Sequence, residues 1–135
     1  METTNSDSAG MYQENILDHY RNPRHKGLIK NPTIQHTERN PLCGDEITVM
    51  LTLDTRGTIT DIRFVGKGCA ISIASMSMLA EKVEGKSIRE VLTMNKDTVV
   101  GMLNIPIGPA RLKCALLGLT AVKKALVAYE NKKGE

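Results

Sequence analysis

The chain has 135 residues, of which 41% are hydrophobic and 24% charged, a balance typical of one globular domain. Its net charge of +3 and its 3% of aromatic residues argue against a nucleic-acid-binding protein, which needs a concentrated basic surface or stacking aromatics. No apolar run reaches the roughly 20 residues that span a bilayer, and the polar N-terminus shows no signal peptide. We therefore expect no membrane association and a cytoplasmic location.

The N-terminal third predicts one helix and a long connection. Residues 1–10 are expected to be a disordered segment that precedes a single domain over 11–130, and 131–135 a polar tail. Tyr12, Ile16 and Tyr20 recur at helical spacing, which predicts a helix over 11–21 that ends before Pro23. Residues 22–41 are rich in Pro and Asn and predict a partly extended connection, in which 32–38 can form a short edge strand.

The next segment predicts a β-hairpin. Ile47, Val49 and Leu51 alternate with Thr48, Met50 and Thr52, as in a half-buried strand. A turn at 55–57 separates this strand from a second one at 59–65. With the edge strand at 32–38, the sheet has three antiparallel strands.

The remainder of the chain is predicted to be helical. A helix begins at Cys69 and ends at Gly85, and two short helices follow at 87–94 and 96–103, the first with Ser87 and Glu90 as its expected capping box. A last helix runs over 110–130 with Pro109 at its start. Helices that follow a small antiparallel sheet indicate the α+β class.

The three cysteines, Cys43, Cys69 and Cys114, each lie at the boundary of a predicted element. An odd number of widely spaced cysteines does not form a closed disulfide framework and is typical of a reducing compartment. The positive end of a helix and the neighbouring Lys67 and Lys113 favour the thiolate form, which binds metals. A single cysteine is more often a small buried hydrophobic residue, but three at such boundaries favour a functional site.

Asp45 is the fourth candidate ligand. It can cap local amides in a turn, or it can supply an oxygen ligand that completes a set with three thiolates. No CxxC pair supports a zinc finger or a redox motif, and the three histidines lack metal-ligand spacing. For His19, His25 and His36, surface positions or local hydrogen bonds are expected.

Four motifs carry a resemblance to a known family. They are LDHYRNPRHKG at 17–27, NPLCGDEITV at 40–49, GKGCAISIASMSMLAE at 66–81 and RLKCALLGL at 111–119. In this order they resemble the U-type iron–sulfur cluster assembly scaffolds, which include IscU, SufU and the N-terminal domain of NifU. The resemblance covers about residues 11–130.

The resemblance implies a three-stranded antiparallel sheet with helices packed on one face. It implies that Cys43, Cys69 and Cys114 meet at one exposed end with Asp45, which is linked to cluster lability in the family. There a scaffold, not an enzyme, assembles a [2Fe–2S] cluster, with Zn²⁺ or Fe²⁺ as alternative occupants. The implied partners are an IscS- or SufS-like cysteine desulfurase, an iron donor and cluster acceptor proteins, and a homodimer that bridges one cluster also fits the family.

Two features place the chain between the branches of this family. Many IscU proteins have His at the position of Lys113, whereas SufU-type proteins have Lys there, as this chain does. Lys113 is expected to handle charge or protons. The 44 residues between Cys69 and Cys114 are too few for the insertion that SufU proteins usually carry.

IPIGPAR at 105–111 replaces the segment that specialised chaperones bind in IscU. A zinc-dependent sulfur acceptor that activates a desulfurase, and a structural zinc module, remain alternatives.

Overall fold

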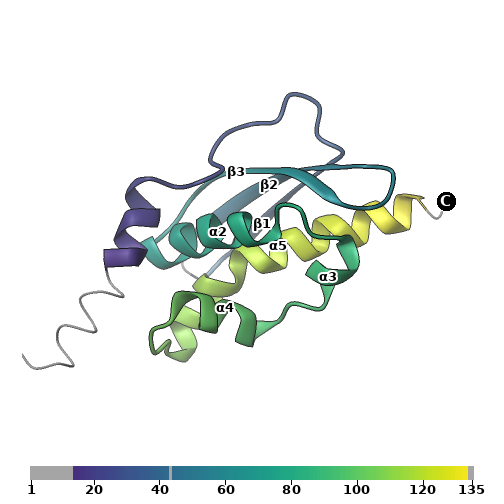
Figure 1. The fold of residues 1–135 in the computed structure, drawn as a ribbon. Helices are drawn as coiled ribbons and strands as arrows, with labels where there is room; N and C mark the ends of the chain where they lie inside the picture. The colour runs from purple at the N-terminus through teal and green to yellow at the C-terminus, as the bar shows by residue number, and fades with distance from the viewer. Residues whose placement is uncertain (1–13, 43, 134–135) are drawn as a thin grey trace, which may run out of the picture.

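A computed structural model describes residues 14–42 and 44–133 of the chain. Its elements, in chain order, are helical residues 14–21, β1 (Ile34–Asn40), β2 (Asp45–Leu53), β3 (Ile59–Lys67), α2 (Ala70–Val83), α3 (Ile88–Leu92), α4 (Lys96–Leu103) and α5 (Pro109–Lys133). The predictions made for residues 1–13, Cys43 and 134–135 lie outside the described residues. The predicted α+β class is confirmed (Figure 1).

The sheet has the order β1-β2-β3, and both strand pairs are antiparallel. Ile47, Val49 and Leu51 in β2 are fully buried, as their alternation predicts. The edge strand predicted at 32–38 exists as β1. Met50 points to the other face but is only 2% exposed, so the outer face of the sheet also buries some apolar surface.

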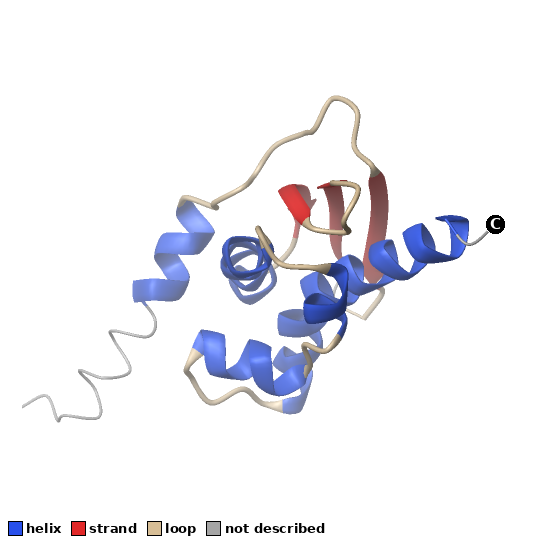
Figure 2. Cartoon of the chain, turned by 45° about the vertical axis from the view of Figure 1, so that its right-hand side comes forward, coloured by secondary structure: helices blue, strands red, loops and turns tan. Residues whose placement is uncertain are grey.

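The helices cover one face of the sheet (Figure 2). α5 packs on β1 and β2, and α2 packs on β3 and against α5. α5 contacts both the sheet and α2, so it is buried on two sides, including Ala121 and Ala125 outside its main apolar stripe. A Cβ on Gly118 would lie 2.8 Å from Met76 Sδ, so the glycine allows α2 and α5 to approach closely.

The connection before β1 is attached to the edge of β3 (Figure 1). The amide of Phe64 donates to the carbonyl of His25 at 3.0 Å, and the amide of Gly27 donates to the carbonyl of Phe64 at 2.9 Å. Of the histidines, only His36 makes the expected local contact, with Nε2 2.8 Å from Glu38 Oε1, whereas His19 Nδ1 lies 2.8 Å from Ser77 Oγ in α2, far along the chain.

Capping residues set the starts of the short helices. Ser87 and Glu90 form the predicted capping box of α3, and Asn95 caps α4 in the same way. α5 begins at Pro109 and continues to Lys133, three residues beyond its predicted end.

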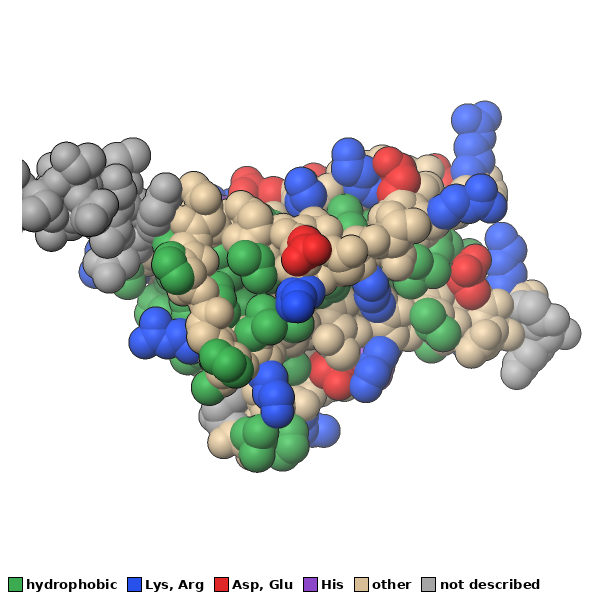
Figure 3. Space-filling model, turned by 90° about the horizontal axis from the view of Figure 1, so that it is seen from below, with side chains coloured by type: hydrophobic (Ala, Val, Ile, Leu, Met, Phe, Trp, Pro, Cys, Tyr) green, Lys and Arg blue, Asp and Glu red, His purple; other side chains and the backbone are tan. Residues whose placement is uncertain are grey.

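The surface carries no large field of one sign on the face seen from below. There, Lys and Arg side chains alternate with Asp and Glu (Figure 3), in keeping with the small net charge. Within residues 14–42 and 44–133, no helix has the length and apolar character needed to cross a membrane.

Candidate metal centre

Three elements begin at one end of the molecule, and each contributes a candidate ligand. Asp45 is the first residue of β2, Cys69 is the N-cap of α2, and Cys114 lies in the second turn of α5. Gly44, which precedes Asp45, has a left-handed φ of 74° that a glycine adopts without strain. The strand pairing that brings the ends of β2 and β3 together therefore also brings Asp45 next to Cys69.

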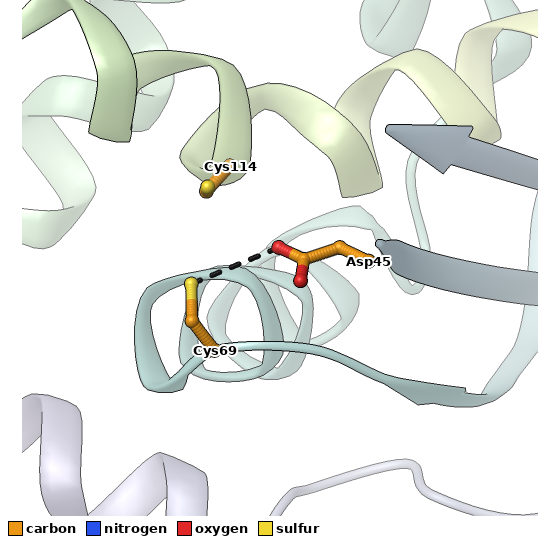
Figure 4. A group of neighbouring side chains, drawn as sticks. All are labelled: Asp45, Cys69 and Cys114. Carbon is orange, nitrogen blue, oxygen red and sulfur yellow. Dashed lines mark hydrogen bonds between the residues drawn. The ribbon is translucent and has the colours of Figure 1, made fainter. Parts of the chain in front are cut away.

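The ligand atoms of Asp45, Cys69 and Cys114 all lie within 4.8 Å of one another and point toward one another (Figure 4). The Sγ of Cys69 donates to Asp45 Oδ2 over 3.7 Å, and the Sγ of Cys114 lies 3.9 Å from the carbonyl oxygen of Ala110. Asp45 is only 4% exposed and Cys114 only 9%, whereas Cys69 is exposed. The site therefore has two buried walls and one open side.

Ser72 is a polar neighbour of the site that sequence reasoning missed. Its hydroxyl is buried, donates to Asp45 Oδ2, and lies 3.3 Å from Cys69 Sγ. The only signal in the sequence is its position three residues after Cys69, which places it in the first turn of α2. In the sequence, Ser72 cannot be distinguished from the other small residues of α2, because nothing there shows that Asp45 lies beside it.

Two glycines at the end of β3 let the chain pass close to β2. A Cβ on Gly68 would lie 2.9 Å from Asp45 Cγ and 3.0 Å from Oδ1, so this residue leaves the space that the carboxylate occupies. A Cβ on Gly66 would lie 2.4 Å from the backbone oxygen of Glu46. The Gly-Lys-Gly segment is therefore shaped by close approach to Asp45 and Glu46.

The donor set fits a thiophilic metal. Two ligands bound at the usual zinc distances in tetrahedral geometry lie roughly 3.3–3.8 Å apart, and the Cys69 Sγ to Asp45 Oδ2 separation of 3.7 Å falls in this range. Thiolates suit zinc and iron–sulfur clusters, and a carboxylate oxygen is a harder companion ligand. The arrangement can hold a metal through three donors and leave an accessible position beside Cys69.

The other predicted site residues are Cys43, Lys67 and Lys113. Cys43 lies outside the described residues, so its place in the ligand set stays a prediction. Lys67 is the last residue of β3 and pairs in register with Glu46, while Lys113 immediately precedes Cys114 in α5. Both lysines are exposed at the end of the molecule that carries the candidate ligands.

Residues 11–135 match the family described as NifU-like N terminal domain. A Bacillus subtilis protein named zinc-dependent sulfurtransferase SufU is 36% identical, with 93% of this chain and 96% of the relative covered. An Archaeoglobus fulgidus protein named iron–sulfur cluster assembly scaffold protein IscU is also 36% identical, with 93% of this chain and 80% of the relative covered.

Solved structures agree with the sequence relatives. A Fervidobacterium islandicum structure described as an iron–sulfur cluster assembly scaffold protein for the SUF system has a TM-score of 0.74 at 28% identity, covering 88% of this chain and 98% of its own. The N-terminal part of a NifU-like protein from Brucella abortus has a TM-score of 0.72 at 27% identity, covering 90% and 95%. The chain belongs to the NifU-like N-terminal domain family of iron–sulfur cluster assembly scaffolds, in which relatives are named IscU and SufU.

Proposed function

We propose that this chain is a scaffold on which a [2Fe–2S] cluster is assembled and from which the cluster passes to acceptor proteins. The observation that carries the proposal is the convergence of Asp45, Cys69 and Cys114 from three separate elements. Because only Gly44 separates Cys43 from Asp45 in the chain, Cys43 is proposed as the third thiolate. The cluster is cargo here, so the ligands must both hold it and release it.

The ligand set suits temporary binding. Three thiolates and one carboxylate around a cluster core of charge 2+ give a formal net charge of 2−, which the nearby Lys67 and Lys113 partly offset. The carboxylate is a harder ligand than a thiolate and binds iron of a cluster less strongly. Asp45 therefore supplies the position at which a ligand from an acceptor protein exchanges first.

Access to the site supports exchange with protein partners. Cys69 is exposed, whereas Asp45 and Cys114 are buried, so sulfur and iron reach the site from the Cys69 side. Leu42 is 78% exposed immediately before Cys43 in the chain. We expect a cysteine desulfurase that delivers sulfur, an iron donor and acceptors to dock at this open side of the site.

A zinc-dependent sulfur acceptor that activates a desulfurase is the second candidate. The Bacillus subtilis relative carries that name, and Lys113 favours it. Against it, the alignment with this relative needs 143 positions for about 126 residues of this chain, whereas the Archaeoglobus fulgidus scaffold aligns over 126 positions with the same coverage. The relative thus contains additional residues that this chain lacks.

A cluster-transfer assay separates the two candidates. The full chain is incubated without oxygen with cysteine and a cysteine desulfurase, then with iron and dithiothreitol, which reduces persulfide sulfur to sulfide, and finally with an apo-ferredoxin. The scaffold proposal predicts [2Fe–2S] absorption on the chain that moves to the ferredoxin. A persulfide on one cysteine, one tightly held zinc ion and no cluster would support the sulfur acceptor instead. A structural zinc module would unfold on chelation and leave desulfurase turnover unchanged.

A further inference from the structure

A second group of metal-ligand side chains lies far from the cysteines. Ligand atoms of His25, Asp61 and Glu84 all lie within 4.8 Å of one another. Glu84 is the C-cap of α2 and Cys69 is its N-cap, so the 14-residue helix, about 21 Å long, separates this group from the candidate metal centre. We propose that His25, Asp61 and Glu84 form a second site, which binds a divalent transition-metal ion through nitrogen and oxygen ligands.

The imidazole of His25 is oriented as in a metal ligand. Its Nδ1 lies 2.9 Å from the carbonyl oxygen of Ile62, which can only accept a hydrogen bond, so Nδ1 carries the proton. In the neutral ring, Nε2 then bears the lone pair, and it lies 3.7 Å from Glu84 Oε1. A lone pair that faces a carboxylate is unfavourable unless a proton or a cation lies between them. Metal-binding histidines commonly donate their other ring nitrogen to a backbone carbonyl in this way.

The carboxylate of Asp61 supplies the second observation. Its Oδ1 is buried and has no hydrogen-bond partner among the described residues. Arg63 Nε forms an ion pair with this oxygen at 3.3 Å, outside hydrogen-bond geometry, and the Asp61 side chain is 36% exposed. The oxygen thus has a charged neighbour but no hydrogen bond, and a metal ion that displaces Arg63 would coordinate it.

The backbone holds the three ligands in place. The amide of Phe64 donates to the carbonyl of His25 at 3.0 Å, and the amide of Gly85, next to Glu84, donates to the carbonyl of Ile59 at 2.8 Å. Both contacts are to β3, the strand that carries Asp61. The three side chains therefore start from segments that are already fixed to one another, as a metal site requires.

The ligand chemistry selects the class of ion. One imidazole and two carboxylates suit Mn²⁺, Fe²⁺ or Zn²⁺, whereas Mg²⁺ and Ca²⁺ prefer oxygen alone. The two carboxylates balance the charge of a divalent ion. The guanidinium of Arg63 competes with the ion for Asp61, so removal of its charge should strengthen binding.

The test uses Mn²⁺ and the full chain, because Mn²⁺ has little affinity for thiolates and so reports a nitrogen and oxygen site. Electron paramagnetic resonance of free Mn²⁺ should show saturable binding of one ion per chain. His25→Gln and Glu84→Gln should each weaken binding at least tenfold, and Arg63→Gln should strengthen it. His36→Gln is the matched control, since His36 also pairs with a glutamate on the sheet but belongs to no three-ligand group found among the described residues.

Each result bears on the proposal. Glu84 is exposed, so Glu84→Gln should keep the fold, which circular dichroism verifies before titration. Absence of saturable binding, or equal binding by wild-type protein and both ligand variants, would overturn the proposal. Loss of binding in Asp45→Ala instead would assign the ion to the cysteine site and would also overturn it. These outcomes measure Mn²⁺ binding and not cluster assembly, so the two proposals fail separately.

Discussion

Gly68→Ala is expected to weaken metal binding as well as the fold. The new Cβ would lie 2.9 Å from Asp45 Cγ and 3.0 Å from its Oδ1, where ordinary contacts begin near 3.4 Å. The carboxylate must therefore move by about 0.5 Å or the Gly-Lys-Gly segment must shift, at a cost of about 1–3 kcal/mol. The φ of Gly68 is not left-handed, so the alanine itself adds no backbone strain.

The displacement acts on the ligand set. A shift of Asp45 disturbs its hydrogen bond from the buried Ser72 hydroxyl and its separation from Cys69 Sγ. Changes to groups that orient a metal ligand typically lower metal affinity by about 10–100-fold. We expect a loss of zinc affinity of this size for Gly68→Ala, measured by competition with a chromophoric chelator under anaerobic conditions.

Two other glycines provide controls for this experiment. Gly101→Ala in α4 meets no atom within 4 Å and should leave zinc affinity unchanged, with a gain of about 0.5–1 kcal/mol in the free energy of unfolding. Gly66→Ala, whose Cβ would lie 2.4 Å from a backbone oxygen, should lower the midpoint of urea unfolding the most. Wild-type zinc affinity in a folded Gly68→Ala protein would refute the assignment of Asp45 as a ligand.

Three further changes test separate parts of the account. Asp45→Ala removes one negative charge from a mostly buried site and should slow loss of the cluster in visible absorption decay; faster decay would contradict the exchange role of the carboxylate. Ser87→Ala removes the capping box of α3 and should lower the free energy of unfolding in urea by about 1 kcal/mol, and no change would contradict this cap. Burial, aided by Arg24, lowers the pKa of His19 below its ordinary value of about 6.5, so the unfolded chain binds a proton first and stability falls as pH drops below about 6.5. His19→Gln should flatten that part of the pH–stability curve, and an unchanged slope would show that another group causes it.

The fold could be predicted where side-chain periodicity is strong. Alternation in Ile47, Val49 and Leu51 predicted β2, and the capping pair Ser87 and Glu90 predicted the start of α3. α5 was also predicted to within three residues, although its burial on two sides broadens the apolar stripe. The burial of Met50 on the outer face also could not be predicted from alternation, which assigns that face to solvent.

The site could be predicted as a set of residue types but not as a geometry. Cys69 and Cys114 were predicted as ligands because they are thiols at helix starts. Asp45 was predicted as a ligand because it lies two residues after Cys43. Ser72 could not be predicted, because its hydrogen bond to Asp45 depends on the strand pairing that brings Asp45 beside α2. The same limit applies to His25, Asp61 and Glu84, which are far apart in the sequence and meet only at the edge of β3.

The central claim is that the cysteines and Asp45 hold an iron–sulfur cluster. Iron and acid-labile sulfide per chain, measured after anaerobic reconstitution with a desulfurase, test it most directly when wild-type protein is compared with Cys43→Ser, Cys69→Ser and Cys114→Ser. The account predicts equal amounts of iron and sulfide in wild-type protein and a large loss of both in each variant. A wild-type protein that retains only zinc, or variants that keep the full iron and sulfide content, would contradict it.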